Sequence, residues 1–143
     1  LTQMKQSAGS FFGQYGLWPT DVTGSEKEAM VALIDPSEAA FDSDFSDNVN
    51  EDKFRNYLSS YRIGDDGNVK HPFGAGGDVT LKTDDLAGQK YLMFVLTKVP
   101  SREYKNTDEG IDGTIDKDQG IVQADGNLDN NTVTLKYYAN VIR

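Results

Sequence analysis

The sequence lacks cysteine entirely and contains one histidine, His71, among 143 residues. Without cysteine the chain has no disulfide scaffold, no thiolate zinc site and no cysteine nucleophile. A single histidine leaves no material for a histidine-based metal site or a Ser-His-Asp relay. Because His71 directly precedes Pro72, we expect an exposed or turn-packed imidazole with no catalytic role.

Long apolar segments are also missing. The chain has no run of the roughly 20 apolar residues that a transmembrane helix needs, and no signal-peptide pattern. It opens with Leu1 rather than Met, so we expect that an N-terminal piece has been removed. A length of 143 residues with 37% hydrophobic residues suits one domain with one core, covering residues 1–143.

Positive charge is scarce, with 14 Lys and Arg against 23 Asp and Glu, for a net charge of −9. The acidic residues gather in two segments. Residues 35–52 hold seven of them and no Lys or Arg, and residues 101–131 hold eight against three basic residues. A phosphate backbone would be repelled by such a surface, so nucleic acid is excluded as an expected partner.

Residues 1–16 have the pattern of an amphipathic helix. Apolar residues recur at spacings of three and four and predict one buried stripe: Leu1, Met4, Ala8, Phe11, Phe12 and Tyr15. Gly9 and Gly13 lie one turn apart inside this helix, and each costs about 1 kcal/mol relative to Ala. Their lack of a side chain leaves room for another backbone to approach closely.

The stretch FFGQYGLWPT, residues 11–20, predicts how this helix ends. Gly16 suits the left-handed position that follows a helix, and Leu17 is expected to fold back on Phe12. Pro19 prevents the helix from resuming. Only Trp18 is left without an expected partner.

Residues 17–68 read as short helices and loops. Ser25 with Glu28 forms a capping box, which predicts a helix running to Ile34 and stopping at Asp35-Pro36. After an acidic loop, a second helix is expected, with one apolar face: Phe54, Tyr57, Leu58 and Tyr61. Residues 64–67, Gly-Asp-Asp-Gly, predict a turn.

Residues 69–143 change to the alternation of strands. Strands are predicted at residues 78–82, 91–96, 120–124 and 133–141, with Ser101 capping a single helical turn between them. In the last strand, Val133, Leu135, Tyr137, Ala139 and Val141 are expected to face one way. Helices first and strands later predict an α+β fold, in which the N-terminal helix packs on an antiparallel sheet with short helices between.

The acidic segment from residue 108 to residue 131 contains the one candidate metal site, and calcium is the one candidate cofactor. Asp125, Asn127 and Asp129 have the spacing that begins a calcium loop, with Asp112, Asp116 and Asp118 nearby. The glycine and the glutamate that complete the helix-loop-helix motif are replaced by Asn130 and Lys136. A solvated acidic loop is therefore the favoured interpretation, and a looser calcium loop is the alternative.

No enzyme class emerges from the carboxylates. Glycoside hydrolysis needs two carboxylates facing each other across a cleft, and no pattern selects two from 23. A hydrolase that uses two acidic residues would need a deep cleft in which two carboxylates converge. A secreted, calcium-stabilised module that binds carbohydrate through Trp18, or binds protein, is the alternative function that the sequence leaves open.

The order of features resembles the soluble domain of type IV pilin-like proteins, including the pseudopilins of type II secretion. The resemblance rests on an aromatic-Gly-x-x-Pro end to the first helix at residues 15–19, and on EKEAMVAL at residues 26–33. HPFG at residues 71–74 is similar to the Pro-aromatic-Gly turn of that family, and residues 111–113 and 120–122 are similar to its Ile-Asp-Asp-Gly and Gly-x-Val segments.

The resemblance implies that the protein is a filament subunit and not an enzyme. Such a subunit is made as a precursor anchored in the bacterial inner membrane, and it acts in the periplasm or at the cell surface. Its partners would be other pilin or pseudopilin subunits, and also a secreted substrate. Contact with the membrane would be confined to a hydrophobic half-helix before Leu1. The family's calcium loop would correspond to the region around Asp125.

Overall fold

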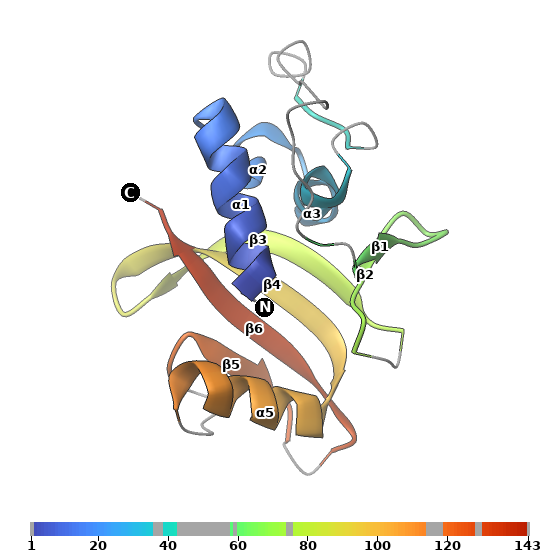
Figure 1. The fold of residues 1–143 in the computed structure, drawn as a ribbon, viewed down its shortest axis with the longest axis vertical. Coiled ribbons are helices and arrows are strands. Elements are labelled where there is room, and N and C mark those ends of the chain that lie inside the picture. The colour runs from blue at the N-terminus through green and yellow to red at the C-terminus, as the bar shows by residue number, and fades with distance from the viewer. Residues whose placement is uncertain are drawn as a thin grey trace.

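The computed structural model describes residues 2–35, 39–42, 58, 60–73, 76–113, 119–127 and 130–142. They form an α+β fold in which helices cover an antiparallel sheet, as the sequence predicts (Figure 1). The helices are α1 (Thr2–Tyr15), α2 (Pro19–Val22), α3 (Glu26–Ile34) and α5 (Ser101–Asp112). The strands are β1 (Arg62–Ile63), β2 (Val69–Lys70), β3 (Asp78–Leu86), β4 (Gln89–Pro100), β5 (Val122–Asp125) and β6 (Thr132–Val141), in the sheet order β1-β2-β3-β4-β6-β5.

One hydrophobic core joins the helices to a single face of the sheet. Helix α1 contributes Met4, Ala8 and Phe11, each with 0% exposure, and these residues belong to the same cluster as the inward residues of α3, α5 and the strands. The predicted spacing of three and four along α1 is therefore confirmed for these positions. Met93 and Tyr138 are buried but lie outside this cluster, because they point to the opposite face of the sheet.

The end of α1 follows the prediction at Gly16 but not at the residues after it. Gly16 has φ 75°, and its N–H donates to the carbonyl of Phe12 over 2.7 Å. Leu17 stays 42% exposed, and the ring that stacks on Phe12 is that of Trp18, at 4.5 Å between centroids. Pro19 opens α2 instead of only blocking α1, because the first position of a helix needs no N–H donor.

Helix α3 begins as its capping sequence predicts. The hydroxyl of Ser25 accepts a hydrogen bond from the N–H of Glu28 over 3.2 Å. The reciprocal bond of a capping box is replaced, since the Glu28 carboxylate accepts from the N–H of Ala40. The helix ends at Asp35, whose N–H donates to the carbonyl of Val31. The bond between Glu28 and Ala40 ties the first turn of α3 to the chain that follows the helix.

Strands β3 and β6 match their predicted alternation until a bulge interrupts β6. Phe94 pairs with Tyr137, but Met93 pairs with Tyr138 while Leu92 pairs with Asn140, so Ala139 is an extra residue. The expectation that Val141 shares the inward face of β6 is therefore wrong. Val141 now pairs with Tyr91, and the amide of Asn140 donates instead to the Lys5 carbonyl of α1.

Helix α5 is longer than predicted and starts differently. It runs for 12 residues rather than one turn, and Pro100 occupies the cap position that was assigned to Ser101. The Ser101 hydroxyl instead donates to the carbonyl of Asn130, and the Ser101 N–H donates to that of Asn131. Both bonds fasten the start of α5 to the segment that leads into β6.

The turn predicted at residues 64–67 is confirmed between β1 and β2, where Gly67 has φ 81°. The helix predicted after the acidic loop falls mostly outside the described residues. Of its expected apolar face, only Leu58 and Tyr61 are described, and both are buried.

Candidate assembly surface on the first helix

The outer side of α1 has two glycines that no other described residue covers. A Cβ placed on Gly9 or on Gly13 would meet no atom within 4 Å, and both residues are exposed. The only charged residue of α1 is Lys5. The glycine pair therefore leaves a shallow, weakly charged strip that no part of the described chain fills.

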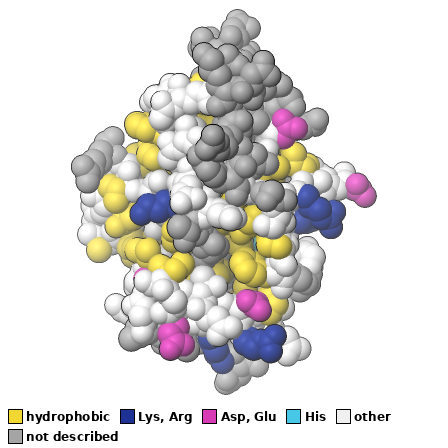
Figure 2. All heavy atoms as spheres, in the orientation of Figure 1, with side chains coloured by type: hydrophobic (Ala, Val, Ile, Leu, Met, Phe, Trp, Pro, Cys, Tyr) yellow, Lys and Arg dark blue, Asp and Glu magenta, His cyan; other side chains and the backbone are white. Residues whose placement is uncertain are grey.

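Apolar side chains border this strip at its C-terminal end. Phe12 is 41% exposed and Leu17 is 42% exposed, and with Ile111 they are the large hydrophobic residues that stay exposed among those described. Trp18 is partly buried and packs on the core, with one ring face against Phe12. On the face seen in Figure 2, which carries the helices, hydrophobic side chains reach the surface in several groups.

The sequence assigned Phe12 to the same stripe as Phe11, and that assignment is wrong. Phe11 is fully buried, whereas Phe12 points outward. Adjacent residues in a helix lie about 100° apart, so a narrow buried stripe cannot hold both. The adjacency was the signal that one of the two phenylalanines belongs to the outer side.

Apolar burial positions helix α1 on its domain. Two long hydrogen bonds also reach it: the Ser7 hydroxyl lies 3.5 Å from the Leu33 carbonyl, and the Asn140 amide lies 3.4 Å from the Lys5 carbonyl. The buried residues Met4, Ala8 and Phe11 fix the rotation of the helix. The sheet therefore determines which side of α1 faces outward.

The structure gives Asp112 a role that the sequence did not predict. Its two carboxylate oxygens accept hydrogen bonds from the N–H groups of Ile121 (3.2 Å) and Val122 (2.9 Å). Gly120, with φ 79°, lies so close that a Cβ there would be 2.4 Å from an Asp112 oxygen. The carboxylate thus joins the end of α5 to the start of β5.

The other candidate calcium ligands are not brought together in the described residues. Asp125 forms an ion pair with Lys136 at 3.0 Å, and Asn127 is exposed. Asp116, Asp118 and Asp129 lie outside the part of the chain that the structure describes. Within that part, no three Asp, Glu or His side chains form a group that could hold a metal ion.

His71 is buried in a turn, as expected, and uses both ring nitrogens. Nε2 lies 2.5 Å from the carbonyl of Thr97, and Nδ1 accepts from the N–H of Phe73 over 3.2 Å. Burial lowers the pKa of the imidazole, although the Thr97 carbonyl and Asp78 oppose this effect. Both ring nitrogens of His71 therefore take part in hydrogen bonds to the backbone.

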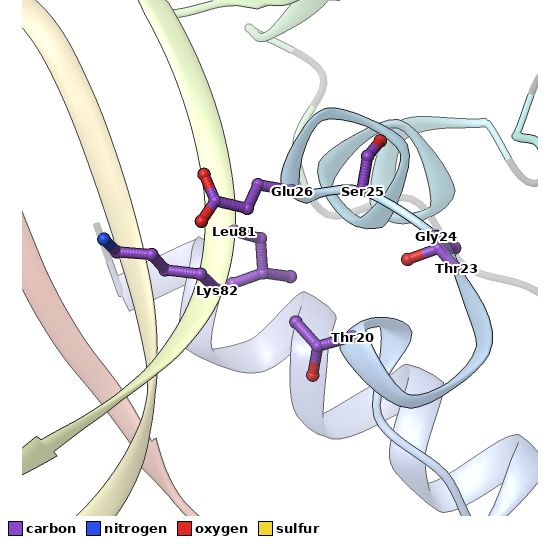
Figure 3. A pocket seen from close by; sticks show the side chains of 7 residues that line it. All are labelled: Thr20, Thr23, Gly24, Ser25, Glu26, Leu81 and Lys82. Carbon is purple, nitrogen blue, oxygen red and sulfur yellow. The ribbon is translucent and has the colours of Figure 1, made fainter.

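A shallow pocket of about 200 Å³ lies between β3 and the segment that joins α2 to α3. Figure 3 shows Leu81 and Lys82 on the strand side, with Thr23 and Gly24 across the space. The hydroxyls of Thr23 and Ser25 already take part in local hydrogen bonds. Two of the hydroxyls that line the pocket are therefore already bonded within the chain.

Comparison with known proteins returns no matching family model, and no curated protein or solved structure matches the chain. Among the described helices, none has the length and hydrophobicity needed to cross a bilayer.

Proposed function

We propose that this chain is the globular domain of a filament subunit, of a type IV pilus or a type II secretion pseudopilus, that assembles through its first helix. The observation that carries the proposal is the two-sided character of α1. Met4, Ala8 and Phe11 are fully buried, whereas Gly9 and Gly13 face open space. One side of the helix is used by its own domain, and the other remains available to a neighbouring helix.

The energetics of the glycines support an external contact. Each glycine in a helix interior costs about 1 kcal/mol of stability relative to Ala. No described residue comes within 4 Å of the Cβ position of Gly9 or Gly13, so no contact within the described chain makes use of the missing side chains. Small residues four positions apart permit two helices to pack with their backbones close together. An intermolecular helix contact would offset a cost that the isolated domain does not recover.

The partners are other pilin-like subunits, and the membrane contact is made only by a hydrophobic segment that precedes Leu1. Assembly starts from the inner membrane and places the domain in the periplasm or at the cell surface. Exposed Phe12 and Leu17 would add apolar area where a neighbouring subunit meets the end of α1.

The gene upstream of Leu1 provides the first test. We expect a Gly-Phe processing point followed by about 20 apolar residues that continue α1. A native start codon directly before Leu1 would contradict the proposal.

Substitution of the glycines in the full-length protein provides the second test. Gly9→Leu and Gly13→Leu should leave the domain folded, because both positions have room, but should lower the yield of sheared or pelleted filaments. Gly110→Leu is the matched control, since Gly110 is also an exposed helical glycine with no atom within 4 Å of its Cβ position. Normal filament yield from both α1 variants would contradict the proposal.

A further inference from the structure

One side of strand β3 is largely unpaired in the described part of the chain. Strand β4 pairs with residues 79–86, whereas β2 pairs only with Asp78 and Val79. No described strand lies beside residues 80–86 on the β2 side. An open strand edge presents backbone donors and acceptors that can pair with another chain.

The hydrogen bonds around the start of β3 show which residues face this edge. The His71 N–H donates to the Gly77 carbonyl on the β2 side, and the Asp78 N–H donates to the Thr97 hydroxyl on the β4 side. Backbone direction alternates along an antiparallel strand. The N–H and C=O groups of Leu81, Thr83 and Asp85 therefore point toward the open edge.

The charged side chains at this edge are self-complementary. Lys82 and Asp84 are two residues apart, so they lie on the same face of the sheet. If a second copy pairs antiparallel about Thr83, Lys82 of each copy lies opposite Asp84 of the other. Opposite charges in such cross-strand pairs are stabilising, and like charges are destabilising.

The same charges destabilise the neighbouring registers. Displacing one strand by two residues keeps Leu81, Thr83 and Asp85 as the hydrogen-bonding residues but places Lys82 opposite Lys82 or Asp84 opposite Asp84. Charged residues on an edge usually prevent pairing between chains. Here their order leaves one register free of opposed like charges.

A pocket of about 200 Å³ opens beside Leu81 and Lys82, at the start of this edge (Figure 3). On the face away from the helices, the Asp84 carboxylate accepts from the Tyr138 hydroxyl over 3.2 Å and from the Asp85 N–H over 3.0 Å. In the proposed pairing, the Asp85 N–H would exchange its bond to Asp84 for a carbonyl of the second copy, and the Asp84 carboxylate would turn to Lys82 of that copy.

We propose that β3 is a homodimerisation edge, at which two copies pair antiparallel about Thr83 into one continuous sheet with two Lys82–Asp84 pairs. This contact uses β3 and not the outer side of α1. It therefore stands independently of the proposed filament function and can be tested on residues 1–143.

Charge exchange measured by sedimentation equilibrium tests the register. Lys82→Glu and Asp84→Lys should each weaken dimerisation on the order of tenfold, because each converts two attractive pairs into two repulsive ones. The double variant Lys82→Glu/Asp84→Lys should restore it. Lys136→Glu, which makes the same charge change on β6, should leave the dimerisation constant unchanged. A monomer at every concentration up to about millimolar, or no restoration in the double variant, would overturn the proposal.

Cysteine cross-linking provides a second measurement, since the chain has no cysteine of its own. In the proposed register, Thr83 faces Thr83 with a Cα separation of about 5.5 Å, which a disulfide can span. Thr83→Cys should therefore form covalent dimers under mild oxidation. Asp85→Cys should not, because the two copies of residue 85 would lie about 13 Å apart. Equal cross-linking of both variants would indicate random collision and contradict the register.

Discussion

His71 fastens the segment between β2 and β3 to the central strand β4. The N–H of Phe73 donates to Nδ1, so the proton of the neutral ring lies on Nε2, which donates to the Thr97 carbonyl. A protonated ring would lose the bond to Phe73, since Nδ1 would no longer accept. The arrangement favours the neutral imidazole, in agreement with the pKa that burial lowers.

The stability of the protein should therefore depend on pH through His71. The unfolded chain takes up a proton near its ordinary pKa of 6.5, whereas the folded protein does so only at lower pH. The contribution is fully present above about pH 6.5 and is lost as the pH falls below this value. His71→Gln keeps an amide donor for Thr97 but cannot titrate. Urea unfolding of both proteins at a series of pH values should show the wild type losing stability relative to the variant below about pH 6.5. A difference that stays constant with pH would contradict this role.

Gly77 lies so close to His71 and to Thr97 of β4 that no side chain fits at this position. A Cβ at this position would lie 1.9 Å from the Thr97 carbonyl oxygen and 2.3 Å from Nε2 of His71. Gly77→Ala should lower the free energy of unfolding by about 1–3 kcal/mol, the usual cost of forcing extra volume into a packed site. Gly24→Ala, where the added Cβ meets nothing within 4 Å, is the control and should change the urea midpoint far less. Equal effects of the two substitutions would argue against this packing.

Helix α1 has a buried side that packs on the domain and an outer side whose two glycines lower the stability of the folded protein. Gly9→Ala and Gly13→Ala should each raise the free energy of unfolding by about 0.5–1 kcal/mol, because Ala favours the helix and has room at both positions. Thermal or urea unfolding of residues 1–143 measures this gain. Loss of stability in either variant would mean that another part of the chain approaches the helix there.

Asp112 connects the end of α5 to the start of β5 through two hydrogen bonds. Asp112→Ala should lower the free energy of unfolding by about 1–3 kcal/mol, because the N–H groups of Ile121 and Val122 would lose their acceptor. The loss should be the same in chelator and in millimolar calcium. If calcium stabilises the wild type and the effect of the substitution disappears in chelator, the carboxylate acts as a metal ligand instead.

Elements with a strong local signal were predictable from the sequence. The spacing of Met4, Ala8 and Phe11 predicted α1, Ser25 predicted the start of α3, and the alternation in residues 133–139 predicted most of β6. The bulge at Ala139 was not predictable, because it depends on pairing with β4. Nor was the exchange of Leu17 for Trp18 beside Phe12, which follows from where α2 places the ring.

At the scale of the whole molecule, the α+β fold follows from helices that precede strands, and one core unites them. The candidate surface on α1 was only partly foreseeable. Gly9 and Gly13 predicted a close approach by another backbone, but only the structure shows that the described chain leaves their outer side open. The edge of β3 was not foreseeable, because its exposure depends on how far β2 extends.

Photo-cross-linking in assembled filaments tests the central claim, that the outer side of α1 is the assembly surface. A photoreactive residue at position 13 of the full-length protein should link to the first helix of a neighbouring subunit. The same residue at position 110, on the outer side of α5, should not. Links from position 13 that stay within one chain, or no difference between the two positions, would contradict the account.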